Sequence, residues 1–99
     1  MEIKDLQAQM NQFVADKGWY AADSSKPQTP KNIAISLVLE ANEVLEHFQW
    51  GEGIKNKEEL KGELADVALY LLQLSYLCKI DLEESIQKKL EYNYRRSWE

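Results

Sequence analysis

The sequence is poor in several features on which small domains often depend. Among its 99 residues there is one cysteine, Cys78, so no disulfide can form within the chain. The longest apolar run, Val67 to Leu72, is far too short to span a bilayer. The polar amino terminus does not have the pattern of a signal peptide. These absences predict a soluble, cytoplasmic protein.

Basic residues are also scarce. The chain has 12 lysines and arginines against 17 aspartates and glutamates, which gives a formal net charge of −5. Binding the phosphates of DNA or RNA calls for a basic face, so no nucleic-acid polymer is expected as a partner. The acidic excess is concentrated in residues 31–66, which carry four basic and eight acidic side chains. Either a solvated helix face or a binding site would explain this concentration.

The length of the chain predicts one domain, residues 1–99. A hydrophobic fraction of 44% excludes wholesale disorder. A chain this short buries only about two thirds of the surface that its unfolded form exposes. It therefore needs an efficient core, a metal ion or a partner chain.

No segment alternates between polar and apolar residues, so no sheet is expected. Helical spacing instead predicts four helices, and the fold class is all-α, a four-helix bundle. Thr29-Pro30, Asn56 with Glu59, and Asp81 with Glu84 are helix-start signals. The four helices are expected at about 2–16, from 30 to the WGEG stretch at 50–53, at 57–78, and from 82 onward. Residues 18–29 are predicted to form a long loop, a class of segment that is often functional.

The predicted third helix carries apolar residues nearly all round. One stripe holds Leu60, Leu64, Val67, Leu71 and Leu74, and further leucines lie elsewhere on the same cylinder. Such a helix must be buried on more than one face. In a four-helix chain the second partner is expected to be another subunit, so homo-oligomerisation is predicted.

Two pairs of acidic residues border these apolar stripes. Glu40 and Glu43 lie one turn apart at the edge of the second helix, in line with His47, which is expected beside the acids or on the surface. Glu63 and Asp66 lie in the same way on the third helix. If the two helices pack antiparallel, four carboxylates face each other across one groove. Their repulsion would be relieved by a hard divalent cation, and oxygen-only ligands indicate Mg²⁺ or Mn²⁺.

A single acidic pair on a helix would be interpreted as ordinary surface charge. Two such pairs beside apolar stripes favour the alternative, a metal site. A di-iron centre is excluded, because it requires Glu-x-x-His on two helices and this chain has a single histidine.

At these residues the sequence resembles the MazG-like, all-α nucleotide pyrophosphohydrolases, in particular small single-domain members related to dCTP pyrophosphatase. The family pattern, E-x-x-E followed by E-x-x-D, is present as Glu40-Ala-Asn-Glu43 and Glu63-Leu-Ala-Asp66. The similarity extends over about residues 13–96. The resemblance implies that the four acids are the catalytic, Mg²⁺-binding residues.

The resemblance also implies a set of substrate-binding residues. Lys89 and Asn93 match a K-x-x-x-N motif that contacts the nucleotide and its phosphates. Tyr70 matches an aromatic or hydroxyl position in the substrate site. Trp19 and Trp50 match aromatic residues near the base pocket. Asn32 matches the asparagine that follows a proline–basic step in the family.

The reaction implied is hydrolysis of a nucleoside triphosphate to the monophosphate and pyrophosphate, with water attacking the α-phosphorus. A dCTP-like deoxynucleotide and a house-cleaning or pool-control role are expected, in a homodimer or homotetramer. The sequence departs from the family in a longer segment 19–30, in Gln28 where some relatives have histidine, and in Gly62 where an acid is common. The alternatives are dUTP, a phosphoribosyl nucleotide, or a non-catalytic helical interaction module.

Overall fold

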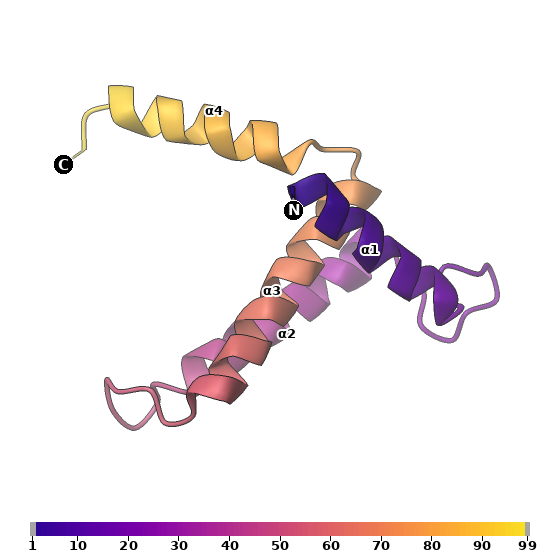
Figure 1. Cartoon of the computed structure of the whole chain (residues 1–99), viewed down its shortest axis with the longest axis horizontal. Helices are drawn as coiled ribbons and strands as arrows, with labels where there is room; N and C mark the ends of the chain where they lie inside the picture. The colour runs from indigo at the N-terminus through magenta and orange to yellow at the C-terminus, as the bar shows by residue number, and fades with distance from the viewer. Residues whose placement is uncertain (1, 99) are drawn as a thin grey trace.

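The computed structural model describes residues 2–98. In this part of the chain all regular structure is helical (Figure 1), which confirms the all-α prediction. No helix within it is long and apolar enough to cross a membrane. The helices are α1 (Ile3–Asp16), α2 (Pro30–Glu46), α3 (Lys57–Leu77) and α4 (Leu82–Arg95).

Three of the helices begin at the residues that the sequence indicated. The side chain of Thr29 accepts a hydrogen bond from the Asn32 N–H at 3.1 Å, and Asn56 accepts one from the Glu59 N–H at the same distance. Asp81 caps α4 in the same way. Each cap satisfies an N–H group that has no partner within the helix. Local sequence thus fixes where these helices start.

Helices α2 and α3 form an antiparallel hairpin (Figure 1). The side chain of His47, just after α2, contacts Glu63 near the start of α3. At the other end, Gln28 lies against Gln73. The antiparallel packing on which the predicted carboxylate groove depends is therefore present.

Helix α1 packs across the second half of α3. Met10 and Val14 form a buried cluster with Leu72, against which Trp19 and Tyr20 are partly buried. The side-chain amide of Gln7 donates to the carbonyl oxygen of Leu72 at 2.8 Å. These contacts place the segment that follows α1 next to α3.

Helix α4 stands away from the other three (Figure 1). Its first residue, Leu82, packs against the core cluster, but no residue within α4 itself is buried. The radius of gyration is 16.0 Å, compared with about 13 Å for a compact chain of this length. Within one chain only α1, α2 and α3 pack together, so completion of the bundle by a second subunit remains a prediction.

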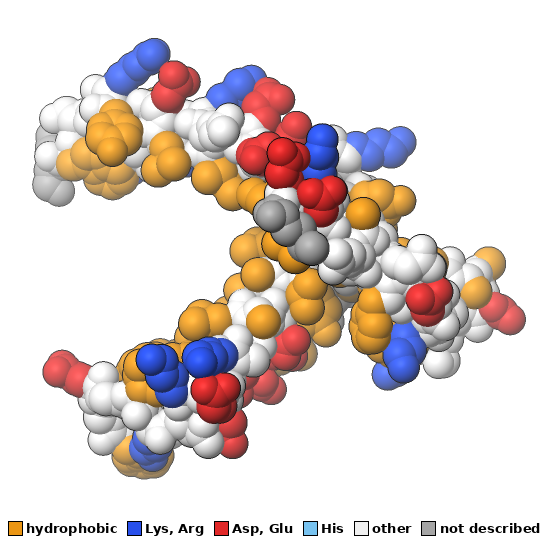
Figure 2. All heavy atoms as spheres, in the orientation of Figure 1, with side chains coloured by type: hydrophobic (Ala, Val, Ile, Leu, Met, Phe, Trp, Pro, Cys, Tyr) orange, Lys and Arg blue, Asp and Glu red, His pale blue; other side chains and the backbone are white. Residues whose placement is uncertain are grey.

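Apolar side chains are exposed to solvent on α4 and on the α2–α3 hairpin, on both sides of the angle between them. In α4, Ile86 is 44% exposed and Leu90 is 55% exposed. In α3, Leu60 is buried as predicted, whereas Leu64 is 51% exposed. Figure 2 shows hydrophobic side chains along the edge of α4 that faces this opening and along α3. Helices α1 and α2 cover only part of α3 in one chain. Burial of the remaining face by a second subunit stays a prediction.

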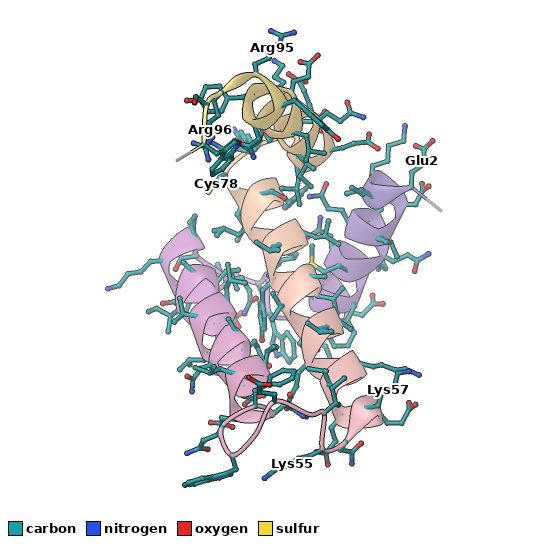
Figure 3. All side chains as sticks on the ribbon, turned by 90° about the vertical axis from the view of Figure 1, so that its left-hand side faces the viewer. Glu2, Lys55, Lys57, Cys78, Arg95 and Arg96 are labelled. Atoms are coloured by element: carbon teal, nitrogen blue, oxygen red, sulfur yellow. The ribbon has the colours of Figure 1, made fainter. Side chains whose placement is uncertain are left out.

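The junction between α3 and α4 is a tight turn. Cys78 ends α3 and Lys79 adopts the left-handed conformation with φ 58°. The N–H of Ile80 then donates to the carbonyl oxygen of Ser75 at 2.8 Å. Figure 3 shows Cys78 at this junction, with Arg95 and Arg96 at the end of α4 and Lys55 and Lys57 near the α2–α3 loop. The turn directs α4 away from the hairpin.

Candidate active site

The four predicted carboxylates lie on the facing sides of α2 and α3. Glu40 and Glu43 are one turn apart on α2, and Glu63 and Asp66 are one turn apart on α3. Glu40 and Glu63 are partly buried, whereas Glu43 and Asp66 are exposed. The hairpin therefore presents a paired acidic surface at the edge of its apolar interface.

Glu40 lies at the centre of this group. Burial raises the pKa of Glu40 above its ordinary value, and the charge of Glu43, together with a hydrogen-bonding contact to it, raises the pKa further. Asp66 and Glu63 act in the same direction. All three other carboxylates are thus close enough to be felt electrostatically by Glu40. The structure brings together the four acids that the sequence singled out.

His47 belongs to this cluster. Its imidazole is buried, and its Nε2 contacts Oε2 of Glu63. His47 is 16 residues from Glu63 in the sequence, and the turn of the hairpin brings the two together. Of the two positions expected for His47, beside the acids or on the surface, the structure shows the first.

The donor set fits a hard divalent cation. Glu40 Oε2 is buried and meets no hydrogen-bond donor among the described residues. A buried carboxylate oxygen without a partner is costly unless a cation binds it. In residues 2–98, no three side chains of the His, Cys, Asp or Glu type are already placed to enclose a metal ion. Binding therefore requires the carboxylates to draw closer together.

A pocket of about 720 Å³ lies next to the carboxylates. Asp66 lies in its wall, and Ser36 of α2 lines it as well. Its volume is in the range typical of small-molecule sites, about 300–1,000 Å³. The lining comes from α1, the segment after it, α2 and α3, and includes four of the predicted site residues: Trp19, Asn32, Asp66 and Tyr70.

One wall of the pocket is aromatic and is carried by residues 17–29. The ring of Trp19 packs edge-to-face against Phe13, with 5.7 Å between the ring centroids. The ammonium group of Lys26 lies 5.0 Å from the centre of the Trp19 ring. An aromatic surface of this kind can stack a planar base, and the cation beside it favours an anionic ligand.

Three of the predicted substrate-binding residues do not reach this pocket within one chain. Trp50 lies in the α2–α3 loop and is 78% exposed. Lys89 and Asn93 are on α4, where the Lys89 ammonium group lies 4.8 Å from the centre of the Tyr92 ring. Trp19 and Tyr70 therefore lie in the pocket next to the carboxylates, whereas Trp50 and the two residues of α4 are separate from it.

The structure also shows pocket residues that the sequence reasoning missed. Gln73 is buried in α3 and lines the pocket together with Gln28. Gln73 follows Asp66 by seven residues and Tyr70 by three, so the three share one helix face. A glutamine between Leu72 and Leu74 is a polar residue in an apolar segment. That anomaly was the signal available in the sequence.

Comparison with known proteins gives three related findings. The MazG nucleotide pyrophosphohydrolase domain matches residues 28–97. The human and mouse proteins named dCTP pyrophosphatase 1 are 29% and 28% identical over 95% of this chain. The chain spans 58% of the length of each of these relatives.

A solved structure is similar as well. The crystal structure of a pyrophosphatase from Archaeoglobus fulgidus superposes with a TM-score of 0.79 and 34% sequence identity. The match covers 93% of this chain and 88% of the archaeal one. The domain match and the structural match both include the acidic hairpin, α2 and α3, and α4. The chain belongs to the MazG family of nucleotide pyrophosphohydrolases.

Proposed function

We propose that this protein hydrolyses a nucleoside triphosphate to the nucleoside monophosphate and pyrophosphate, in a reaction that requires Mg²⁺. The observation that carries the proposal is the placement of Glu40 and three carboxylates that act on it electrostatically beside a pocket with an aromatic wall. The carboxylates are suited to the charged end of the substrate and the pocket to its base. Mn²⁺ would be an effective substitute for Mg²⁺ with oxygen ligands.

Glu40, Glu43, Glu63 and Asp66 would hold the metal. When bound, Mg²⁺ neutralises charge on the carboxylates and the triphosphate and makes a nearby water more acidic. Without such neutralisation, the triphosphate and a chain of net charge −5 would repel each other.

The chain's own groups would position water and substrate. We assign the general base to Glu40, because it is partly buried at the apolar edge of the cluster. It would take a proton from the water that attacks the α-phosphorus. The bond between the α-phosphorus and the bridging oxygen then breaks, and pyrophosphate leaves. No covalent enzyme intermediate is needed, so position and charge account for the catalysis.

The base would enter the pocket lined by Trp19, Asn32 and Tyr70. A dCTP-like deoxynucleotide is the substrate proposed, and similarity to proteins named dCTP pyrophosphatase 1 supports it. Removal of unwanted nucleotides or control of the nucleotide pool is the role proposed, in the cytoplasm.

The decisive experiment measures pyrophosphate release from the four deoxynucleoside triphosphates, dUTP and a phosphoribosyl nucleotide. Each is assayed with Mg²⁺, with Mn²⁺ and with EDTA. We expect release from dCTP with Mg²⁺ and none with EDTA. Release of inorganic phosphate alone, or activity that survives EDTA, would contradict the proposed reaction.

We further propose that the active form is a homodimer or homotetramer. Lys89 and Asn93 match the phosphate-binding motif but lie on α4, away from the pocket of their own chain. Asn93 Oδ1 and Arg96 Nε, near the end of α4, are buried without a hydrogen-bond partner among the described residues. A second copy would cover the exposed apolar side chains of α4 and bring these groups to a site. Light scattering that finds only monomers at micromolar concentration would contradict this.

A further inference from the structure

The most buried polar side chain of the pocket has no part in the proposed chemistry. Gln73 is 3% exposed, although it lies in an apolar stretch of α3. It lies on the same helix face as Asp66 and is seven residues further along. At the helical rise this separation is about 10 Å, so Gln73 lies in the pocket wall well away from the carboxylates.

The Gln73 amide holds the segment of residues 17–29 at two places. Its Nε2 donates to Gln28 Oε1 at 2.7 Å and to the Tyr20 hydroxyl oxygen at 3.4 Å. The Tyr20 hydroxyl in turn donates to Oδ1 of Asn11 in α1 at 2.6 Å. Because Tyr20 is near the start of the segment and Gln28 near its end, one buried amide connects both ends of the segment to α3.

These hydrogen bonds can run in only one direction. Gln28 Nε2 is 2.6 Å from the carbonyl oxygen of Lys26, which can only accept. The amide nitrogen of Gln28 must therefore face that oxygen, which leaves Gln28 Oε1 for Gln73. Gln73 in turn must present its NH₂ group. A side chain of the same shape without that donor would leave the partly buried Gln28 Oε1 without its partner.

We propose that Gln73 is a positioning residue that fixes the Trp19–Gln28 wall of the pocket and so determines which nucleobase the enzyme accepts. The proposal rests on the proposed function, since it names the specificity element of the same site. Trp19, Lys26 and Gln28 all line the pocket, and Gln28 is oriented by Gln73. An oriented amide can discriminate between bases, because a mismatched base leaves buried polar groups unpaired.

The test compares Gln73→Glu with the native protein. Glutamate has the same size, but its carboxylate cannot donate to Gln28 Oε1. The control is Gln12→Glu, because Gln12 is exposed on α1, donates its side-chain hydrogen bond to Asp16 of the same helix, and does not line the pocket. Tyr20→Phe is a second variant, which removes both hydrogen bonds of the Tyr20 hydroxyl, to Asn11 and from Gln73, with little change of shape.

The first measurement is hydrogen–deuterium exchange of residues 19–28 without nucleotide or metal. We expect exchange at least tenfold faster in Gln73→Glu, a smaller increase in Tyr20→Phe, and no change in the control. Unchanged exchange in both network variants would overturn the positioning role. This measurement is independent of catalysis, so it decides the role of Gln73 in the segment even if the chain hydrolyses no nucleotide.

The second measurement is kcat and KM for each deoxynucleoside triphosphate. In Gln73→Glu, we expect KM for the preferred nucleotide to rise about tenfold and kcat to change little. The ratio of kcat/KM between the preferred nucleotide and the others should decrease. A uniform fall in kcat for every nucleotide, or an unchanged order of preference, would overturn the role in specificity. If Gln73→Glu does not fold, the same two outcomes are read from Tyr20→Phe.

Discussion

Two regions of this molecule are built in opposite ways. Helices α1, α2 and α3 enclose a core, a pocket and a carboxylate cluster, and polar side chains such as Gln73 are buried there with partners. Helix α4 buries no residue, and Tyr94 near its end is 91% exposed. The first region has a core within one chain, although α2 and α3 also keep exposed apolar side chains such as Val38 and Leu64. The second region has no buried residue of its own.

The contrast coincides with a separation of the carboxylate cluster from the cations that could bind phosphate. The four interacting carboxylates are on α2 and α3, while Lys88, Lys89, Arg95 and Arg96 are on or next to α4. A triphosphate held by a metal at the carboxylates would need cations on its other side. Under the proposed function, the separation implies that α4 would supply its cations to the site of a second copy.

Removing one carboxylate gives the largest expected effect. Asp66→Asn should fold normally and lose Mg²⁺-dependent pyrophosphate release by about 10²-fold or more, because the cluster loses a charged ligand. Glu46→Gln is the matched control, since Glu46 is exposed at the end of α2. Steady-state kinetics provide the measurement. Near-native turnover of Asp66→Asn would contradict the site assignment.

The role of α4 is tested by Lys89→Ala. Loss of a charge-assisted contact to phosphate should lower kcat/KM roughly 10- to 100-fold, while Lys88→Ala, whose ammonium group is paired with Glu84, should have little effect. Mixing Lys89→Ala with Asp66→Asn should restore part of the activity if α4 serves the site of a second copy. No recovery after subunit exchange would mean that α4 does not act across subunits.

The contact between His47 and Glu63 is expected to orient Glu63 for metal binding. His47→Leu should weaken Mg²⁺ binding about tenfold, as is typical when a residue that supports a metal ligand is removed. Isothermal titration with Mg²⁺ alone measures this directly, with Gln49→Leu in the exposed stretch after α2 as control. Unchanged affinity would show that Glu63 needs no support from the imidazole.

A smaller effect concerns stability and pH. The pKa of Glu40 is raised above 4.5, so the folded state holds the proton more tightly than the unfolded state. The metal-free protein should therefore lose this contribution to stability as pH rises from about 4.5 toward neutrality. Glu40→Gln should remove this pH-dependent loss of stability. In thermal unfolding in EDTA, the melting temperature of Glu40→Gln should therefore exceed that of the native protein by a margin that grows with pH. An advantage that is constant or shrinks with pH would contradict the raised pKa.

The smallest expected effect is at the α3–α4 turn. Lys79 has φ 58°, a conformation that costs a residue with a Cβ about 1 kcal/mol relative to glycine. Lys79→Gly should therefore leave stability unchanged or raise it by up to about 1 kcal/mol, since its greater unfolded-state freedom offsets part of the gain. Lys79→Val should destabilise the protein. Chemical unfolding measures both, and equal stability of the two variants would show that the turn is not held in this conformation.

The features that could be predicted from the sequence are those that depend on neighbours along the chain. Thr29 caps α2 through Asn32, three residues away, and such local chemistry is visible in the sequence. Helical periodicity placed Glu40 and Glu63 at the edges of their apolar stripes, and antiparallel packing then brought the two pairs together. The family resemblance at the same residues is confirmed by the match over residues 28–97.

The features that could not be predicted depend on contacts between distant segments. The bond between Gln28 and Gln73 joins residues 45 apart, and nothing near either residue indicates it. Trp50 was placed near the base by resemblance alone, and its position depends on how the α2–α3 loop meets other surfaces. The departure of α4 from the hairpin depends on the left-handed conformation of Lys79, which residue type alone does not reveal.

The exposed apolar face of α4 has a consequence for the folding of the chain. If a second copy covers that face, folding and association are one equilibrium, and the melting temperature rises with protein concentration. The newly made chain would then be most vulnerable to proteolysis while its copies are few. Abundance would then regulate the lifetime of this protein before any ligand binds.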